Sequence, residues 1–272
     1  LGPDIESIAG EKCGIIKRGR PVVAAGMDAA ALAVIRRVAR ERQCRLVEAG
    51  QSVNVRATSV SLKGQKVSIE TGDASYGAVT LPLLGRHQLS NLATAVAAVE
   101  TLNDATGLNI DDSAVRKGVT GVTWPGRFQV LKEAPPVILD GAHNPGGAAA
   151  LADTLKQVLK GKPVGLVFGM CDDKDIRGYL KALGKVVKRL WAVPLRSERS
   201  LPVSQVAAAG RALGWEAGEA TLAQAIAEAE AWARSEGGAV CIAGSLFLVG
   251  EVLEKMGLAP GSVATAGKSE KT

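Results

Sequence analysis

Hydrophobic and polar positions alternate regularly in the second half of the chain. Short apolar runs are separated by longer stretches with helical periodicity. The runs are residues 137–139, 164–168, 190–193 and 239–243, and the helical stretches are 146–159, 175–187, 203–213 and 222–235. Uniformly apolar strands that alternate with helices are typical of a parallel sheet with both faces covered. This half is therefore predicted to be a Rossmann-like α/β domain with a mostly parallel sheet.

The first half has a mixed pattern that also predicts an α/β arrangement. Its expected elements are a strand at 21–25, a helix at 28–42, a hairpin of 52–62 with 65–70, and helices over 90–105 and 112–118. Ser90 is expected to be the N-cap of the long alanine-rich helix. Residues 121–126 interrupt the pattern, which predicts two domains, 1–124 and 125–272. The small, polar tail from about residue 260 is expected to be mobile.

Composition and charge narrow the class of protein. The formal net charge of +6 permits an anionic partner, but aromatic residues that would stack on bases are only 3% of the chain, so nucleic acid is not favoured. The longest apolar stretch, 239–249, is too short to span a bilayer, and no signal peptide is visible. The four cysteines lack paired spacing and are interpreted as reduced thiols. We therefore expect a cytoplasmic protein without membrane contact.

The segment Asp140-Gly-Ala-His-Asn-Pro145 follows an apolar run and precedes a helical stretch. Ligands of open α/β sheets bind at such strand ends, because the next helix presents free backbone N–H groups and the positive end of its dipole. Asp140 and His143 are therefore candidates for ligand contacts. The alternative is a structural turn, in which Asp140 or Asn144 accepts local backbone hydrogen bonds and Pro145 starts the helix. On these residues alone, both interpretations are equally supported.

Six segments of the chain match, in order, those of a known family. They are 8–17 (IAGEKCGIIK), 84–96 (LGRHQLSNLATAV), 124–128 (WPGRF), 137–145 (VILDGAHNP), 169–175 (GMCDDKD) and 244–250 (GSLFLVG). In these segments the chain resembles the folylpolyglutamate synthase and dihydrofolate synthase family, within the wider group of Mur-type ATP-dependent amino-acid ligases. One such match would be unspecific, whereas six in the family's order are a specific resemblance.

The resemblance implies an activity, cofactors and a domain assignment. The activity is the ATP- and Mg²⁺-dependent joining of L-glutamate to folate or dihydropteroate, through an acyl phosphate, by a cytoplasmic monomer. Residues 1–124 would be the C-terminal part of the central ATPase domain, and 125–272 the Rossmann-like C-terminal domain. The matched segments correspond to about the C-terminal two-thirds of such an enzyme. Dihydrofolate synthase, folylpolyglutamate synthase and dual activity are not separated by these residues.

Three residues are implied to bind ATP together, from both domains. Asn91 matches an asparagine that lies against the nucleotide, where its amide offers a donor and an acceptor to the adenine edge. Arg127 resembles the family arginine that reaches the phosphates, which a guanidinium can bind bidentately. Asp140 matches an aspartate that contacts ATP at the ribose. The structural alternatives are that Asn91 shares helix capping with Ser90 and that Arg127 forms a surface salt bridge.

Two further residues are implied to act in catalysis. Lys12 occupies the position of a carbamylated lysine, whose carbamate oxygen would be an anionic ligand for Mg²⁺. Without the resemblance, Glu11 and Lys12 are interpreted as a solvated charged pair. His143 occupies a position near the γ-phosphate and the incoming amino acid. It would orient the glutamate amine or stabilise charge on the transferred phosphoryl group.

A third group of residues is a candidate for binding the amino-acid substrate. Asp173, Lys174 and Asp175 lie at the end of another predicted strand. The equally supported alternative is that they cap the helix that follows.

The chain contains no P-loop, which the family uses to bind the ATP phosphates. A near match at 261–269 has five residues between its glycines instead of four. In the family, the P-loop and two Mg²⁺ ligands lie upstream of the matched segments. Because the chain begins abruptly at Leu1, we expect sequence to be missing upstream, and the 272 residues alone not to turn over ATP efficiently.

Other functions are weighed against this one. A Mur-type ligase for a cell-wall precursor and a non-catalytic nucleotide-binding remnant are the alternatives that the sequence leaves open. A Rossmann oxidoreductase has little support, because no GxGxxG follows a predicted strand.

Overall fold

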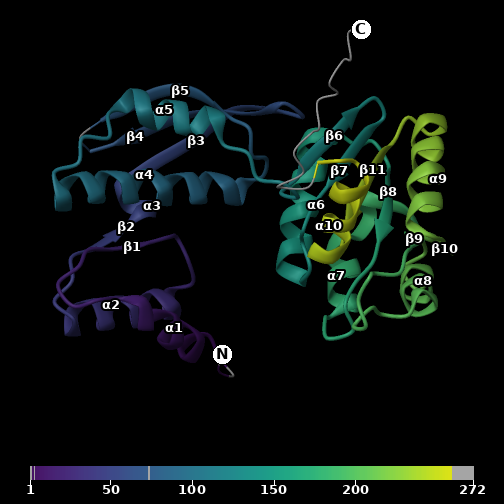
Figure 1. The fold of residues 1–272 in the computed structure, drawn as a ribbon, viewed down its shortest axis with the longest axis horizontal. Helices are drawn as coiled ribbons and strands as arrows, with labels where there is room; N and C mark the ends of the chain where they lie inside the picture. Colours follow the sequence, from purple (N-terminus) through teal and green to yellow (C-terminus); the bar gives the residue numbers. More distant parts are fainter. Residues whose placement is uncertain (1, 3, 73, 259–272) are drawn as a thin grey trace, which may run out of the picture. The chain divides into compact units, whose positions relative to one another are not determined.

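The computed structural model describes residues 2, 4–72 and 74–258. The chain divides into two units, Leu1–Thr123 and Trp124–Thr272, which are described separately (Figure 1). The division predicted from sequence, after residue 124, is one residue away. The predicted mobile tail and the near match to a P-loop at 261–269 lie outside the described residues.

The first unit begins with a small parallel sheet, two longer helices and a third helix of about one turn. Its elements are α1 (Ile5–Lys12), a 3-10 turn (Cys13–Ile15), β1 (Val22–Ala24), α2 (Ala29–Glu41), β2 (Leu46–Glu48) and α3 (Ala49–Ser52). Asp4 caps α1 and Asp28 caps α2, each by accepting a backbone hydrogen bond from the first turn. Cys13, Ile16 and Val38 are buried between the two helices. The strand and helix predicted at 21–25 and 28–42 are confirmed.

An antiparallel sheet with helices on one face completes the first unit. It consists of β3 (Val53–Ser61), β4 (Gly64–Thr71) and β5 (Ser75–Leu81), with α4 (Arg86–Thr106) and α5 (Asp112–Gly121). Val67 and Ile69 of β4 are fully buried and pack with Val96 of α4 and Val115 of α5. The predicted hairpin is confirmed, because Ser61 pairs with Gly64 across the turn.

The start of α4 differs from the prediction. The helix begins at Arg86, so Ser90 lies inside it and does not cap it. Gly85 precedes the helix at a φ of +111°, a conformation that L-residues rarely adopt, and this lets the chain turn sharply into the helix. The buried Gln65 side chain fixes this turn by donating to the carbonyls of Leu83 (2.8 Å) and Gly85 (3.2 Å).

The second unit is built around a six-stranded sheet with the order β10-β9-β8-β11-β7-β6. The strands are β6 (Gln129–Glu133), β7 (Pro136–Leu139), β8 (Val164–Phe168), β9 (Val187–Ala192), β10 (Glu216–Glu219) and β11 (Ala239–Ala243). Only β6, at one edge, runs antiparallel to its neighbour. The predicted mostly parallel sheet is confirmed, and β6 and β10 are additional edge strands.

Helices cover this sheet, as Figure 1 shows. They are α6 (Pro145–Leu159), α7 (Ile176–Leu183), α8 (Val203–Arg211), α9 (Leu222–Ser235) and α10 (Leu246–Lys255). Helices α9 and α10 share one core cluster with β7, β8, β9 and β11. On the other face, Tyr179 of α7 packs on Phe168 of β8 with 5.1 Å between ring centroids, Gly210 of α8 lies against Leu190 of β9, and α6 packs along α7. The sheet is therefore the middle of three layers.

The predicted helix at 175–187 is shorter than expected. Helix α7 ends at Leu183, a 3-10 turn covers Gly184–Val186, and Val187 begins β9. Throughout the described part of the chain, the search for a helix of membrane-spanning length and apolarity finds none.

Candidate functional site

The loop that follows β7 is organised by Asp140. Its Oδ2 accepts a hydrogen bond from the backbone N–H of Phe128 (2.8 Å), and its Oδ1 accepts one from the N–H of Ala142 (2.8 Å). Its own N–H donates to the carbonyl of Ile242 on β11 (3.0 Å). Asp140 therefore satisfies local backbone donors, as the structural interpretation predicts. Each carboxylate oxygen accepts up to two hydrogen bonds, so this role does not exclude a ligand contact.

Helix α6 starts directly after this loop. The Asn144 side chain accepts a hydrogen bond from the N–H of Gly147 (2.8 Å), and Pro145 occupies the first helical turn. The capping function predicted for Asn144 and the helix start at Pro145 are confirmed. The positive end of the α6 dipole consequently lies at the loop that contains Asp140 and His143.

The ring of His143 has a fixed orientation. Its Nδ1 lies 2.9 Å from the carbonyl oxygen of Gly141, and the side chain is partly buried. A carbonyl oxygen only accepts hydrogen bonds, so Nδ1 must hold the proton in the neutral ring. Nε2 then has a lone pair, and His143 can accept a hydrogen bond from an amine at this atom.

Arg127 lies against the same loop. A Cβ atom at Gly141 would be 2.8 Å from an Nη atom of Arg127 and 2.6 Å from Leu246, which shows that the guanidinium passes directly over the Gly141 backbone. The N–H of Gly141 also donates to the carbonyl of Gly126 (2.7 Å). The structure therefore brings Arg127, Asp140 and His143 together around one loop.

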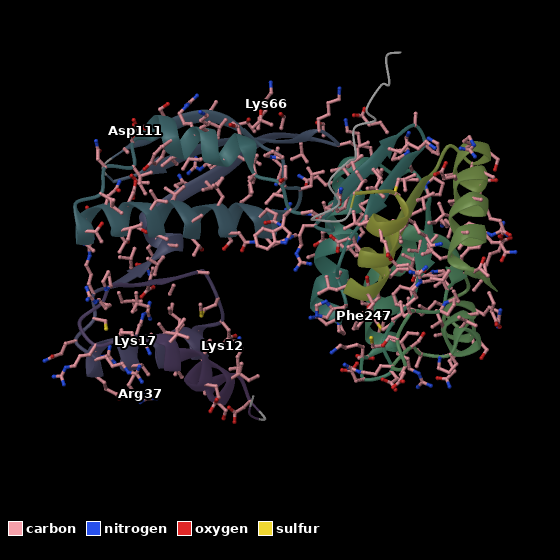
Figure 2. All side chains as sticks on the ribbon, in the orientation of Figure 1. Lys12, Lys17, Arg37, Lys66, Asp111 and Phe247 are labelled. Atoms are coloured by element: carbon pink, nitrogen blue, oxygen red, sulfur yellow. The ribbon has the colours of Figure 1, made fainter. Side chains whose placement is uncertain are left out.

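The first turn of α10 borders this loop. The sequence did not identify any residue of this turn as a candidate site residue. Ser245 caps α10 by accepting from the N–H of Phe247 (3.1 Å), and the N–H of Gly244 donates to the carbonyl of Ala142 (3.2 Å). Leu246 and Phe247 are 53% and 54% exposed, and Figure 2 shows Phe247 at the N-terminal end of α10. The sequence signal for this turn was the matched segment 244–250. Its apolar residues resemble part of a buried helix, so they did not suggest an exposed surface.

Lys12 and Asn91 belong to the first unit. Lys12 is the last residue of α1 and its side chain is exposed (Figure 2). Asn91 lies in the second turn of α4 and donates from Nδ2 to Oε1 of Gln88 (3.0 Å), so it neither opens nor caps the helix. The binding of one nucleotide by Asn91, Arg127 and Asp140 together stays a prediction.

The segment at the end of β8 has mainly structural contacts. Asp175 caps α7 by accepting from the N–H of Gly178 (2.8 Å), which confirms the capping interpretation for this residue. Asp173 forms exposed ion pairs with Arg199 (2.7 Å) and Lys174 (3.0 Å). The hydrogen bond from Lys174, and then that from Arg199, lower the pKa of the Asp173 carboxyl below its usual value.

Replacing Arg199 with glutamine should raise the pKa of Asp173 toward its usual value. A lowered folded-state pKa means that the ion pair stabilises the fold above the unfolded-state pKa, and that this stabilisation is lost as pH falls through the folded-state pKa. A carboxyl ¹³C titration by NMR measures the change. Arg196→Gln is the matched control, because Arg196 pairs with carboxylates of α10. An Asp173 pKa that is equal in both variants would contradict the assignment.

The described residues offer few ligands for Mg²⁺. Within the described ranges, histidine, cysteine, aspartate and glutamate side chains do not form a group of three or more that would hold a metal ion. Lys12, as a carbamate, would add one oxygen ligand on an exposed helix end, where the negative end of the α1 dipole disfavours a further anion. The described residues therefore do not form a complete magnesium site by themselves.

The chain is similar to known enzymes over most of its length. Residues 126–246 match the family model of the Mur ligase, glutamate ligase domain. A dihydrofolate synthase/folylpolyglutamate synthase of Bacillus subtilis is 37% identical over 183 residues, which are 67% of this chain and 43% of that protein. The protein of the same name from Escherichia coli is 34% identical over 254 residues, which are 93% of this chain and 56% of that protein.

Solved structures give the same relationship. Mycobacterium tuberculosis folylpolyglutamate synthase complexed with ADP matches with a TM-score of 0.85 and 30% identity, over 96% of this chain and 61% of that one. Escherichia coli FolC in complex with DHPP and ADP matches with a TM-score of 0.77 and 32% identity, over 94% of this chain and 57% of that one. The chain thus spans about half the length of the curated relatives that it matches.

Proposed function

Since the chain belongs to the dihydrofolate synthase/folylpolyglutamate synthase family, we propose that it functions within an ATP-dependent ligase that joins L-glutamate to folate or dihydropteroate. The main support is the loop after β7, where Arg127, Asp140 and His143 surround the N-terminal end of α6. Relatives were solved with ADP, with AMPPCP, and with DHPP and ADP, which supports a nucleotide and a pterin substrate.

We assign nucleotide binding to three residues. Arg127 would bind phosphate oxygens, because a guanidinium offers paired N–H donors in one plane. The Asp140 carboxylate would accept hydrogen bonds from ribose hydroxyls. Asn91 would contact the adenine edge with its exposed amide.

The acyl-transfer step is assigned to His143. The substrate carboxylate would first take a phosphoryl group from ATP; the glutamate amine would then attack the acyl carbon and lose a proton as phosphate leaves. Nε2 of His143 would hold the amine by accepting one of its hydrogens, because Nδ1 is bound to the Gly141 carbonyl. Positioning the amine in this way converts part of the entropic cost of the reaction into binding.

The magnesium ligand and the residues that bind the amino-acid substrate have less structural support. Mg²⁺ would neutralise phosphate charge when bound, and Lys12 is the residue of this chain that we assign to it, as a carbamate. Asp173 and Lys174 are proposed to bind the glutamate carboxylates or ammonium only after their surface ion pairs open. Asp175 is already used as a helix cap, which makes it the weakest of the three substrate candidates.

Glutamate-dependent ADP release tests the proposal. The 272 residues alone should give no release above background, because they contain no P-loop sequence. The same residues, expressed with whatever coding sequence precedes them at their source, should release ADP only when glutamate and a pterin substrate are both present. Dihydropteroate and tetrahydrofolate, supplied separately, distinguish the two activities of the family. Release that requires a cell-wall precursor instead would contradict the folate assignment.

A further inference from the structure

A groove in the first unit is lined by residues of all three strands of the antiparallel sheet and of α5. It has a volume of about 540 Å³ and is lined by Thr58, Lys66, Ala78, Val79, Thr80, Arg116, Lys117 and Thr120. We call this the Lys66 groove. Volumes of roughly 300–1,000 Å³ are typical of sites for small molecules. Figure 2 labels Lys66 in the part of the unit that holds the sheet and Lys12 in the part that holds α1, so the groove is distinct from the Lys12 region.

Its charged side chains all have the same sign. Lys66 comes from β4, and Arg116 and Lys117 come from α5, while no lining residue is acidic. None of these three cations forms an ion pair with a carboxylate of the described residues. Cations that gather on the walls of a concave site raise the local positive potential and attract anions.

Arg116 is held in place by the sheet edge. Its two Nη atoms donate to the carbonyls of Tyr76 and Ala78 on β5, so the guanidinium is fixed and its remaining N–H groups are positioned in advance. The hydroxyls of Thr58 and Thr120 donate to backbone carbonyls, so they shape the groove without adding free donors. The charged donors of the groove are therefore its three cations.

We propose that the Lys66 groove binds a small polyanion with two or more phosphate or carboxylate groups. Because the three cations come from two elements, they can contact several anionic groups of one ligand better than they can contact a single anionic group. The dipole of α5 does not account for these cations, because Arg116 and Lys117 lie in the middle of the helix and its last turn holds no basic residue. Lys66 comes from β4. The proposal does not depend on the ligase activity.

Calorimetric titration of the 272-residue chain, at low and at moderate salt, tests the groove. The probes are inorganic tripolyphosphate and tri-γ-glutamate, which separate phosphate from carboxylate chemistry. Binding of either probe is expected, and Lys66→Gln with Lys117→Gln should weaken it about tenfold or more. Lys63→Gln is the control, because Lys63 is an exposed lysine of the β3–β4 turn that does not line the groove.

The outcomes distinguish binding of the probe in the Lys66 groove from nonspecific attraction of an anion to a basic protein. Weakening in the double variant with unchanged affinity in Lys63→Gln supports the proposal. Failure of both probes to bind, or equal weakening in Lys63→Gln, overturns it. Both substituted lysines are exposed, and a thermal melt checks that the fold is retained. If the double variant melts early, Lys66→Gln alone is compared with Lys63→Gln and must still bind more weakly.

Discussion

Replacing Asp140 with alanine is expected to raise the ATP requirement of the complete enzyme sharply and to destabilise the second unit by about 2–4 kcal/mol. The carboxylate accepts from Phe128 and Ala142, and alanine would leave both backbone N–H groups without this acceptor. The loop would then no longer hold Arg127 beside Gly141. The nucleotide dissociation constant measures the change in ATP requirement, and urea unfolding measures the loss of stability.

Two comparisons make this prediction specific to the carboxylate. Asp140→Asn keeps one acceptor oxygen but turns an amide N–H₂ toward a backbone donor, so an intermediate loss is expected. Asp153→Asn is the control, since Asp153 is an exposed residue of α6 with only a 3.7 Å ion pair to Lys156. Wild-type stability together with wild-type ATP dependence in Asp140→Ala would refute the assigned function of the loop.

Replacing Gly244 with alanine is expected to lower the free energy of unfolding by about 3–5 kcal/mol. Gly244 has a φ of +113°, and an added Cβ would lie 2.4 Å from the ring of Phe168 and 2.6 Å from the carbonyl oxygen of Gly169. Phe168 is fully buried and packs on Tyr179, so its ring has no space to move. The midpoint of urea unfolding, compared at constant slope, measures the loss.

Gly250→Ala provides the matched control on the same segment. Gly250 lies within α10, and its added Cβ would meet no atom within 4 Å. Alanine should therefore stabilise this helix by about 0.5–1 kcal/mol. If both alanine variants were as stable as the wild type, the close packing between β11 and Phe168 would be wrong.

The sequence predicts the centre of the second sheet better than its edges. The central strands β7, β8 and β11 are buried on both faces, so each is a continuous apolar run. Strand β10 is Glu216-Ala-Gly-Glu219 and mostly exposed, and β6 is only half-buried. Such edge strands form because the neighbouring strand offers backbone hydrogen bonds. This backbone pairing leaves no hydrophobic pattern in the sequence, so the edge strands were not predicted.

The candidate site was also only partly predictable. The motif located Asp140 and His143 at a strand end, and capping rules explained Asn144. The contact between Arg127 and Gly141 joins residues fourteen positions apart, and it depends on how β6 and β7 pair. Asn91 was misplaced relative to the start of α4 because Gly85, whose positive φ starts the helix, lacks the side-chain oxygen that usually identifies an N-cap.

Two hydrogen bonds tie the start of the second unit to the loop after β7: the N–H of Gly141 donates to the carbonyl of Gly126, and the N–H of Phe128 donates to the Asp140 carboxylate. Val122 packs on the core of the first unit, while Gly126 is already tied to the second. The N–H of Arg127 also donates to the carbonyl of Trp124 (3.3 Å), so the contacts of the second unit begin at Trp124. Arg127, Asp140 and His143 are thereby held as one group. A displacement of one of the three would therefore disturb the ligand contacts of the other two.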